Sequence, residues 1–353
     1  MKIALVTDLH FGARNDNQKV AEFQKKFYDD VFFPYLDEHN IKRVIDLGDT
    51  FDRRKFISYT SLRAAKDMFF DPLRLREIET DIIVGNHDVV YKNTLELNSI
   101  KLLLEDYPLF YEHTDPSVID IDGLDILMMP WICKDNFDKC WDMIKTSTAQ
   151  VCMGHLELNG FQMYKGMPNY EGWDAEEFGK FDQVFSGHYH HRSTTGNVIY
   201  LGTAYEMTWS CFEDQKGFHI YDTSTRELEF IPNPHRLFYK VFYEDVDMSY
   251  DYIDGYDFEE LADKYVKVVI KNKTNPIIYD MFINGIENVG PINLQVVEDH
   301  LNLDLEDDGD IIDEAEDTLT ILDSVIESLD LKSDKPELRK LMHNLYNEAL
   351  TVE

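Results

Sequence analysis

Five short clusters of Asp, Asn and His residues are the part of this sequence that could carry out chemistry. They are Asp8-Leu9-His10, Gly48-Asp49-Thr50-Phe51-Asp52, Gly85-Asn86-His87-Asp88, Gly154-His155 and Gly187-His188-Tyr189-His190. Such a mixture suits two divalent ions, which can together clamp the attacking and the leaving oxygen of a phosphoester. One cluster alone is as readily structural as functional, but five in succession favour a dinuclear metal site.

The ligand types also bear on the choice of metal. Imidazole suits transition metals, whereas Mg²⁺ prefers oxygen ligands. The clusters contain four candidate histidine ligands, His10, His155, His188 and His190. They therefore favour Mn²⁺, Fe or Zn²⁺ over Mg²⁺.

Each cluster directly follows a short apolar run that is typical of a buried strand. The runs lie at 3–6, 44–47, 82–84, 151–153 and 184–185. Because strands in an open α/β sheet end at a common crevice, the five clusters are expected to converge. Further strands are predicted at 118–121 and 124–129, joined by an Asp-Gly turn, and at 197–201, 217–221 and 227–231. Apolar residues at helical spacing predict helices over 20–35 and 95–104. Strands and helices together indicate an α/β fold class, with sheets flanked by helices.

The pattern changes after residue 234, which divides the chain into a main domain, 1–234, and three further parts. Residues 235–303 predict a small α+β domain, with strands at 265–270 and 291–297 around a helix at 276–286. Residues 304–317 carry nine acidic side chains in fourteen positions, as expected of a solvated linker. Residues 318–353 predict two amphipathic helices, of which the second presents Leu338, Leu341 and Leu345 on one face.

Charge is the feature that fits a nucleic-acid enzyme least well. Asp and Glu total 68 against 34 Lys and Arg, so the formal net charge is -34. Binding to nucleic acid depends on local basic patches, however, and bound metal ions add positive charge at the site. Basic residues do lie near the clusters, and each could contact phosphate or belong to a solvated loop. They are Arg53, Arg54, Lys55, Lys92 and Arg192.

Composition excludes several other classes of protein. No apolar run approaches the roughly 18 residues of a membrane span, and the N-terminus predicts a strand rather than a signal peptide. The four cysteines show no C-x-x-C spacing, so neither a zinc knuckle nor a disulfide framework is indicated. A reduced, cytoplasmic protein is the simplest expectation.

The order of the motifs, D-x-H, GDxxD, GNHD, GH and GHxH, resembles that of the calcineurin-like metallophosphoesterases. Four further stretches are similar to the SbcD-type recombination and repair nucleases, and to their phage branch most of all. These are Pro130-Trp131, GHLELNG at 154–160, YKGM at 164–167 and FSGHYH at 185–190. The resemblance covers nearly the whole chain.

The resemblance implies two metal sites that share Asp49. One site would use Asp8, His10, Asp49 and His190, and the other Asp49, Asn86, His155 and His188. His87 matches the catalytic histidine of the family, and Asp88 could orient its ring. Many cellular members have a histidine in place of Asp52, so that residue's role is not carried over. A slip of one residue would exchange His190 for His191, although the GHxH spacing favours His190.

The family further implies a manganese-dependent nuclease, acting as an exonuclease on duplex ends and an endonuclease on single strands. Residues 235–303 match the position of its DNA-capping domain. The partner of the terminal helices would be an SMC-like coiled-coil ATPase, and the family suggests a homodimer. If a phage encodes the chain, its location is the cytoplasm of the infected bacterium.

Two other functions remain open at this stage. The first is a phosphatase or phosphodiesterase of the same fold that acts on a substrate other than DNA. A small-molecule phosphatase needs neither a capping domain nor terminal helices, which favours the nuclease. The second is a non-catalytic architectural subunit, and the intact set of ligands argues against it.

Overall fold

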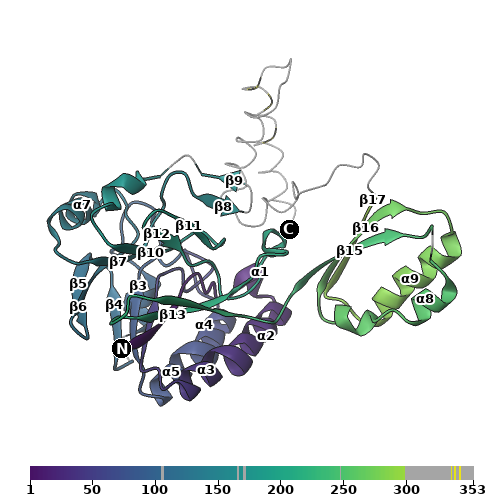
Figure 1. The fold of residues 1–353 in the computed structure, drawn as a ribbon, viewed down its shortest axis with the longest axis horizontal. Coiled ribbons are helices and arrows are strands. Elements are labelled where there is room, and N and C mark those ends of the chain that lie inside the picture. The colour runs from purple at the N-terminus through teal and green to yellow at the C-terminus, as the bar shows by residue number, and fades with distance from the viewer. Residues whose placement is uncertain are drawn as a thin grey trace.

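The computed structural model describes residues 1–298, apart from 105–106, 165–166, 170–171 and 247, and beyond these only 335, 338 and 342. Two six-stranded sheets pack face to face, with helices on their outer faces (Figure 1). This arrangement confirms the predicted α/β fold class. The predicted acidic linker, 304–317, and most of the predicted helical hairpin, 318–353, lie outside the described residues; Lys335, Leu338 and Met342 are helical.

The first sheet is built around four neighbouring parallel strands, and two antiparallel strands extend one edge. Its order is β14 (Leu228–Pro232), β13 (Gly217–Asp222), β1 (Lys2–Val6), β2 (Arg43–Asp46), β3 (Glu79–Ile83) and β4 (Phe110–His113). The strands β1, β2 and β3 correspond to the first three predicted runs.

The second sheet also has parallel strands at its centre and an antiparallel strand at each edge. Its order is β11 (Ser193–Thr195), β12 (Val198–Tyr200), β10 (Gln183–Gly187), β7 (Val151–His155), β6 (Leu124–Met129) and β5 (Ser117–Ile121). The predicted hairpin is confirmed as β5 and β6, and the runs at 151–153 and 184–185 are β7 and β10.

Between the sheets lies an aliphatic core, to which both contribute, for example Leu5 and Ile45 from the first sheet and Met153 and Phe185 from the second. Helices cover the outer face of the first sheet at α2 (Gln18–Phe27), α3 (Phe33–Glu38), α4 (Tyr59–Ala65) and α5 (Asp71–Leu75), and α7 (Phe137–Thr146) packs on the second. Wide π-helical turns at Tyr28–Phe32 and Lys66–Phe70 join two pairs of these helices. Each turn precedes a proline, which lacks an N–H and crowds the carbonyl four residues earlier.

Two short segments differ from a regular helix. The predicted helix over 95–104 is limited to α6 (Ser99–Leu103), because Asn98 pairs with Val89 and its side chain accepts the N–H of Lys101. The segment α1 (Ala13–Asp16) is a left-handed turn, in which Arg14 and Asn15 have φ values of 53° and 59°.

A third, three-stranded parallel sheet lies to one side of the two large sheets (Figure 1). It consists of β15 (Phe238–Glu244), β16 (Tyr265–Asn272) and β17 (Asn293–Glu298), and α8 (Tyr250–Asp254) and α9 (Pro276–Asn288) belong to the same unit. The helix α9 begins where the Asn275 side chain accepts two backbone N–H groups. The unit has its own apolar cluster, centred on Val268, Ile270 and Phe282. A small two-stranded ribbon, β8 (Gln162–Tyr164) and β9 (Met167–Pro168), completes the described strands.

Among the described residues, no helix is both long enough and apolar enough to cross a membrane.

Candidate metal centre

The five polar clusters lie where β1, β2, β3, β7 and β10 end, and the structure brings them together. Four of the residues concerned have positive φ angles although they are not glycine: Asp8 at 52°, His10 at 43°, Asp49 at 57° and His188 at 86°. Side chains other than those of glycine rarely adopt this backbone conformation, and strain of this kind gathers at functional sites.

Glycine makes the close approach of two of these loops possible. A Cβ atom on Gly85 would lie 2.2 Å from Oδ1 of Asp49, and one on Gly48 would lie 2.7 Å from Nδ1 of His155. Gly48 also has a φ of 102°. Any larger residue at either position would push a candidate ligand out of place.

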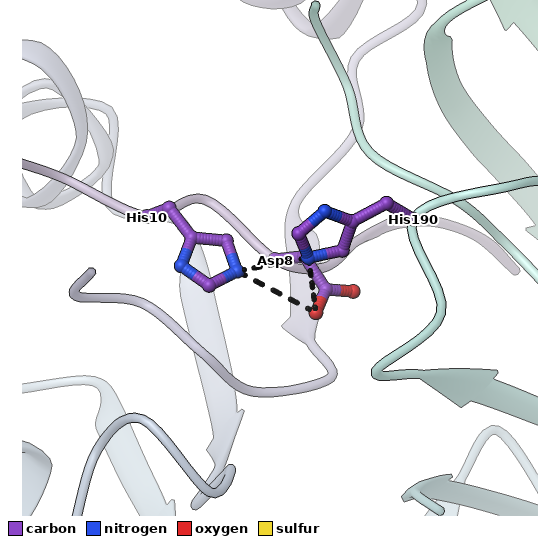
Figure 2. Close-up of side chains that lie close together, drawn as sticks. All are labelled: Asp8, His10 and His190. Carbon is purple, nitrogen blue, oxygen red and sulfur yellow. Dashed lines mark hydrogen bonds and ion pairs between the residues drawn. The ribbon is translucent and has the colours of Figure 1, made fainter. Parts of the chain in front are cut away.

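The first group of candidate ligands contains Asp8, His10 and His190, whose side chains point toward one another (Figure 2). Nε2 of His10 lies 3.1 Å from Nε2 of His190, and the two atoms lie 3.9 and 3.8 Å from Oδ1 of Asp8. Asp8 and His10 are buried and His190 is half-buried. Three donor atoms that converge in this way suit a divalent cation.

The second group contains Asp49, His155 and His188. Oδ2 of Asp49 lies 3.1 Å from Nε2 of His155. The side-chain oxygen of Asn86 lies 2.9 Å from both Nε2 of His155 and Nδ1 of His188, so it belongs to the same cluster. The indole of Trp131 packs against the ring of His188, with the ring centroids 5.2 Å apart.

Burial and neighbouring charge set the protonation of the second group. Burial raises the pKa of Asp49, but the rings of His155 and His87 outweigh this effect and hold the pKa well below its usual range. Burial lowers the pKa of His155, and the carboxylate of Asp49 outweighs it, so the pKa rises to about 9. Burial and then the charge of His155 lower the pKa of His188 well below its usual range. Near neutral pH Asp49 is thus ionised and His188 is neutral, as metal ligands must be, whereas His155 carries a proton that a cation binding to its Nε2 would have to displace.

His87 lies beside both groups. Its backbone N–H donates to Oδ1 of Asp49 at 2.7 Å, and its Nδ1 lies 2.6 Å from the carbonyl oxygen of Asp52. A carbonyl oxygen can only accept, so Nδ1 carries the proton, and Nε2 is the nitrogen that can exchange a proton with a substrate. The ring of His87 stands edge-on to that of His10, with the centroids 4.9 Å apart.

Asp88, which the sequence suggested could orient the ring of His87, contacts the backbone of two loops. Its carboxylate accepts four backbone N–H groups at 2.9–3.3 Å, while the ring of His87 is held by Asp52. The four donors are Gly85, Asp49, Thr50 and Phe51. Asp88 therefore fastens the GNHD loop to the GDxxD loop. Burial and then the charge of Asp49 raise the pKa of Asp88 to about 6.

Comparison with known proteins accounts for this arrangement of ligands. Residues 1–192, more than half of the chain, match the family model described as calcineurin-like phosphoesterase. The chain belongs to the calcineurin-like phosphoesterase family. It is 32% identical over 355 aligned residues to exonuclease subunit 1 of Enterobacteria phage T4, and the match covers 99% of each chain. A solved structure described as a novel archaeal phosphodiesterase covers 66% of this chain, at 14% identity and a TM-score of 0.33.

In this phosphoesterase, every residue that the sequence predicted to bind metal lies in one of the two groups or, in the case of Asn86, beside one. The structure brings His190 to Asp8 and His10, whereas Nδ1 of His191 lies 3.1 Å from Asp214. His190, which the GHxH spacing favours, is thus the histidine beside Asp8 and His10, and its metal-binding role stays a prediction.

Sequence reasoning left one polar side chain of the site without a role. Oδ1 of Asp52 lies 3.5 Å from Nδ1 of His10. Burial raises the pKa of Asp52, but its contact with the ring of His10 and the charges of His10, His87 and Arg53 together hold the pKa below its usual value. Asp52 is the second Asp of the GDxxD cluster, which marks it as a polar residue near the site. Its neighbour His10 belongs to another cluster, so the sequence alone does not pair the two.

The five basic residues of the phosphoesterase are held in different ways. The guanidinium of Arg53 donates to Asn15 and lies 4.9 Å from the ring of Phe56. The guanidinium of Arg192 lies 4.0 Å from the ring of Phe230. Lys55 and Lys92 are exposed and Arg54 is half-buried. A role of these side chains in binding DNA stays a prediction.

Proposed function

We propose that this phosphoesterase is a metal-dependent DNA nuclease, the nuclease subunit of a recombination and repair complex. It would act as an exonuclease on duplex ends and as an endonuclease on single strands. The observation that carries the proposal is the pair of Asp/His groups beside His87. The similarity over 99% of the chain to a phage exonuclease subunit supports DNA as the substrate.

The two groups would hold two divalent ions, for which the four histidines favour Mn²⁺. Asp8, His10, Asp49 and His190 would bind the first ion, and Asp49, Asn86, His155 and His188 the second. When bound, the ions would neutralise charge that develops on the phosphate oxygens. Positive charge there would also draw a DNA strand to a protein with a net charge of -34.

His87 would act as the catalytic acid. Its Nδ1 proton is held by the carbonyl of Asp52, which fixes the ring. Nε2 can then give its proton to the leaving oxygen of the scissile phosphodiester. Histidine is the side chain that most often transfers a proton to or from a reacting group in enzymes.

The remaining parts of the chain would serve substrate and partner binding. Residues 1–234 form the nuclease domain in this proposal, and residues 235–303 cap the DNA. Residues 318–353, with Leu338, Leu341 and Leu345, would bind an SMC-like ATPase through the apolar faces of two helices. The similarity to SbcD-type nucleases suggests that the subunit would act as a homodimer. The complex would work in the cytoplasm of an infected bacterium.

The decisive experiment incubates the protein with end-labelled duplex DNA and with circular single-stranded DNA, each with Mn²⁺. We expect cleavage that a chelator abolishes and added Mn²⁺ restores. An Asp49→Ala protein purified in parallel controls for a contaminating nuclease. Hydrolysis of p-nitrophenyl phosphate with intact DNA would favour a phosphatase. Binding to DNA ends without hydrolysis in Mn²⁺, Fe²⁺, Zn²⁺ or Mg²⁺ would favour an architectural subunit.

A further inference from the structure

Asp52 contacts two histidines of the site through two different groups. Its side-chain Oδ1 lies 3.5 Å from Nδ1 of His10, and its backbone carbonyl oxygen lies 2.6 Å from Nδ1 of His87. Both contacts are made to Nδ1, so both rings keep Nε2 for other partners. One residue therefore orients a candidate metal ligand and the candidate catalytic acid.

The contact with His10 favours one of its ring nitrogens as the metal-binding atom. A carboxylate attracts a proton and cannot donate one, so Oδ1 of Asp52, at 3.5 Å, favours the neutral His10 ring that carries its proton on Nδ1. The lone pair then lies on Nε2, which is the atom that faces His190 and Asp8. Carboxylates that hold the second nitrogen of a histidine ligand in this way orient the ring and make it a stronger ligand.

The backbone of Asp52 is fastened independently of its side chain. Its N–H donates to the carbonyl of Phe11 at 3.2 Å, and two further backbone bonds join the same segments: His10 to Asp49 at 3.0 Å and Phe11 to Thr50 at 2.9 Å. The carbonyl of residue 52 will therefore stay in place when its side chain is changed. The two contacts can be separated by mutation.

We propose that Asp52 is a positioning residue whose carboxylate strengthens metal binding at the Asp8–His10–His190 group, while its carbonyl holds His87 whatever side chain residue 52 carries. This inference rests on the proposed metal role of His10. It assigns a task to a residue of the GDxxD cluster that the sequence left without one. It also predicts that loss of the carboxylate weakens one of the two metal sites and not the other.

The test is a calorimetric titration of the full chain with Mn²⁺, in the absence of DNA. We expect two binding events in the unchanged protein. Asp52→Ala should weaken one of them by about 10–100-fold and leave the other unchanged. Asp52→Asn should lose less, because its amide oxygen can still accept the Nδ1 proton of His10. Asp67→Asn, which removes an exposed carboxylate paired with Arg63, is the matched control and should bind like the unchanged protein.

Two reference variants assign the weakened event to a site. Asp52→Ala should weaken the same Mn²⁺-binding event as His10→Ala, but by less. His155→Ala should weaken the other event. Unchanged Mn²⁺ affinities in Asp52→Ala would overturn the proposal. It would also be overturned if both events weakened equally together with the melting temperature, since Asp52 would then act on the fold as a whole.

A second readout uses the rate of hydrolysis and separates the carboxylate from the carbonyl. Because the carbonyl still holds His87, saturating Mn²⁺ should restore most of the rate of Asp52→Ala, whereas His87→Ala should stay slow at any Mn²⁺ concentration. A rate of Asp52→Ala that saturating Mn²⁺ leaves low would contradict the proposed separation. If the unchanged protein bound two Mn²⁺ ions and cleaved no DNA, the nuclease proposal would fail and the titration would still test Asp52.

Discussion

The buried carboxylate of Glu206 accepts the backbone N–H of Phe238 at 2.9 Å. It also accepts the N–H of Leu237 at 2.6 Å, and so joins the loop after β12 to the start of β15. Both donors belong to residues that are no more than 1% exposed. A single carboxylate thus fixes the point at which the three-stranded unit leaves the two large sheets.

Glu206→Ala is expected to destabilise the protein because it leaves these two N–H groups buried without an acceptor. The free energy of unfolding in urea should fall by about 1–3 kcal/mol. Glu206→Gln keeps an acceptor oxygen and is the matched control, with a smaller loss. Equal stability of Glu206→Ala and the unchanged protein would mean that the joint does not depend on this carboxylate.

Asp49→Ala is expected to abolish hydrolysis and to lower the number of metal ions bound per chain, because Asp49 is proposed to contact both ions. Circular dichroism should show that the fold survives. Elemental analysis of the purified variant gives the metal content. Two fully occupied ions in a folded Asp49→Ala protein would refute the shared-ligand assignment.

His87→Ala is expected to keep metal and DNA binding but to lose most of the rate. The loss should be about 10²–10⁴-fold, as is usual when a catalytic acid is removed. Single-turnover kinetics with saturating Mn²⁺ isolate this step, and binding to DNA ends in Ca²⁺ serves as the control. A rate within a few-fold of the unchanged protein would remove His87 from the mechanism.

His219 predicts a pH dependence of stability away from the metal centre. It is buried on β13 beside Phe230, and burial followed by the charge of Arg192 lowers its pKa to about 3. The unfolded chain binds a proton at His219 near pH 6.5, whereas the folded protein binds it only near pH 3. The stability that depends on a neutral His219 is therefore complete above pH 6.5 and is lost as the pH falls toward 3.

The expected loss between pH 7 and pH 5 is roughly 2 kcal/mol in the free energy of unfolding. His219→Leu should flatten this part of the stability profile, and His39→Leu, at an exposed position, should not. The measurement is urea denaturation at a series of pH values in the presence of a chelator. The same slope in His219→Leu and the unchanged protein would show that other groups control it.

Binding of the ATPase by the C-terminal residues is expected to be separable from hydrolysis of DNA. Deletion of residues 318–353 should remove co-purification with the ATPase and leave Mn²⁺-dependent hydrolysis intact. Leu341→Asp with Leu345→Asp should do the same, because it places charge in an apolar seam. A truncated chain that still binds the ATPase at full strength would place the contact elsewhere, and one that unfolds would place the helices in the core.

The sequence predicted the strands that carry the candidate ligands because their signal is local. An apolar run that ends in Asp, Asn or His is visible in six or seven consecutive residues, as at β1 and β7. Two strands with mixed exposure, β4 and β15, were missed. In β4 only the first and last residues are buried, and β15 contains Lys240 and an exposed Phe242.

The supporting contacts of the site could not be predicted, because they join residues that are far apart in the chain. The carboxylate of Asp88 reaches the backbone of Asp49, and that of Asp52 reaches the ring of His10. Composition and spacing identify such residues as polar and near a motif. Their partners depend on how the loops pack, which only the tertiary structure gives.

The positive φ angles of Asp8, His10 and Asp49 affect which mutations would raise the stability of this enzyme at the expense of its activity. Glycine adopts such a conformation without strain, so replacing any of these residues by glycine relaxes the backbone while it removes a proposed metal ligand. Selection for thermal stability alone, without a demand for catalysis, would thus reward inactive chains. A screen for hardier variants of this protein must score hydrolysis in every round.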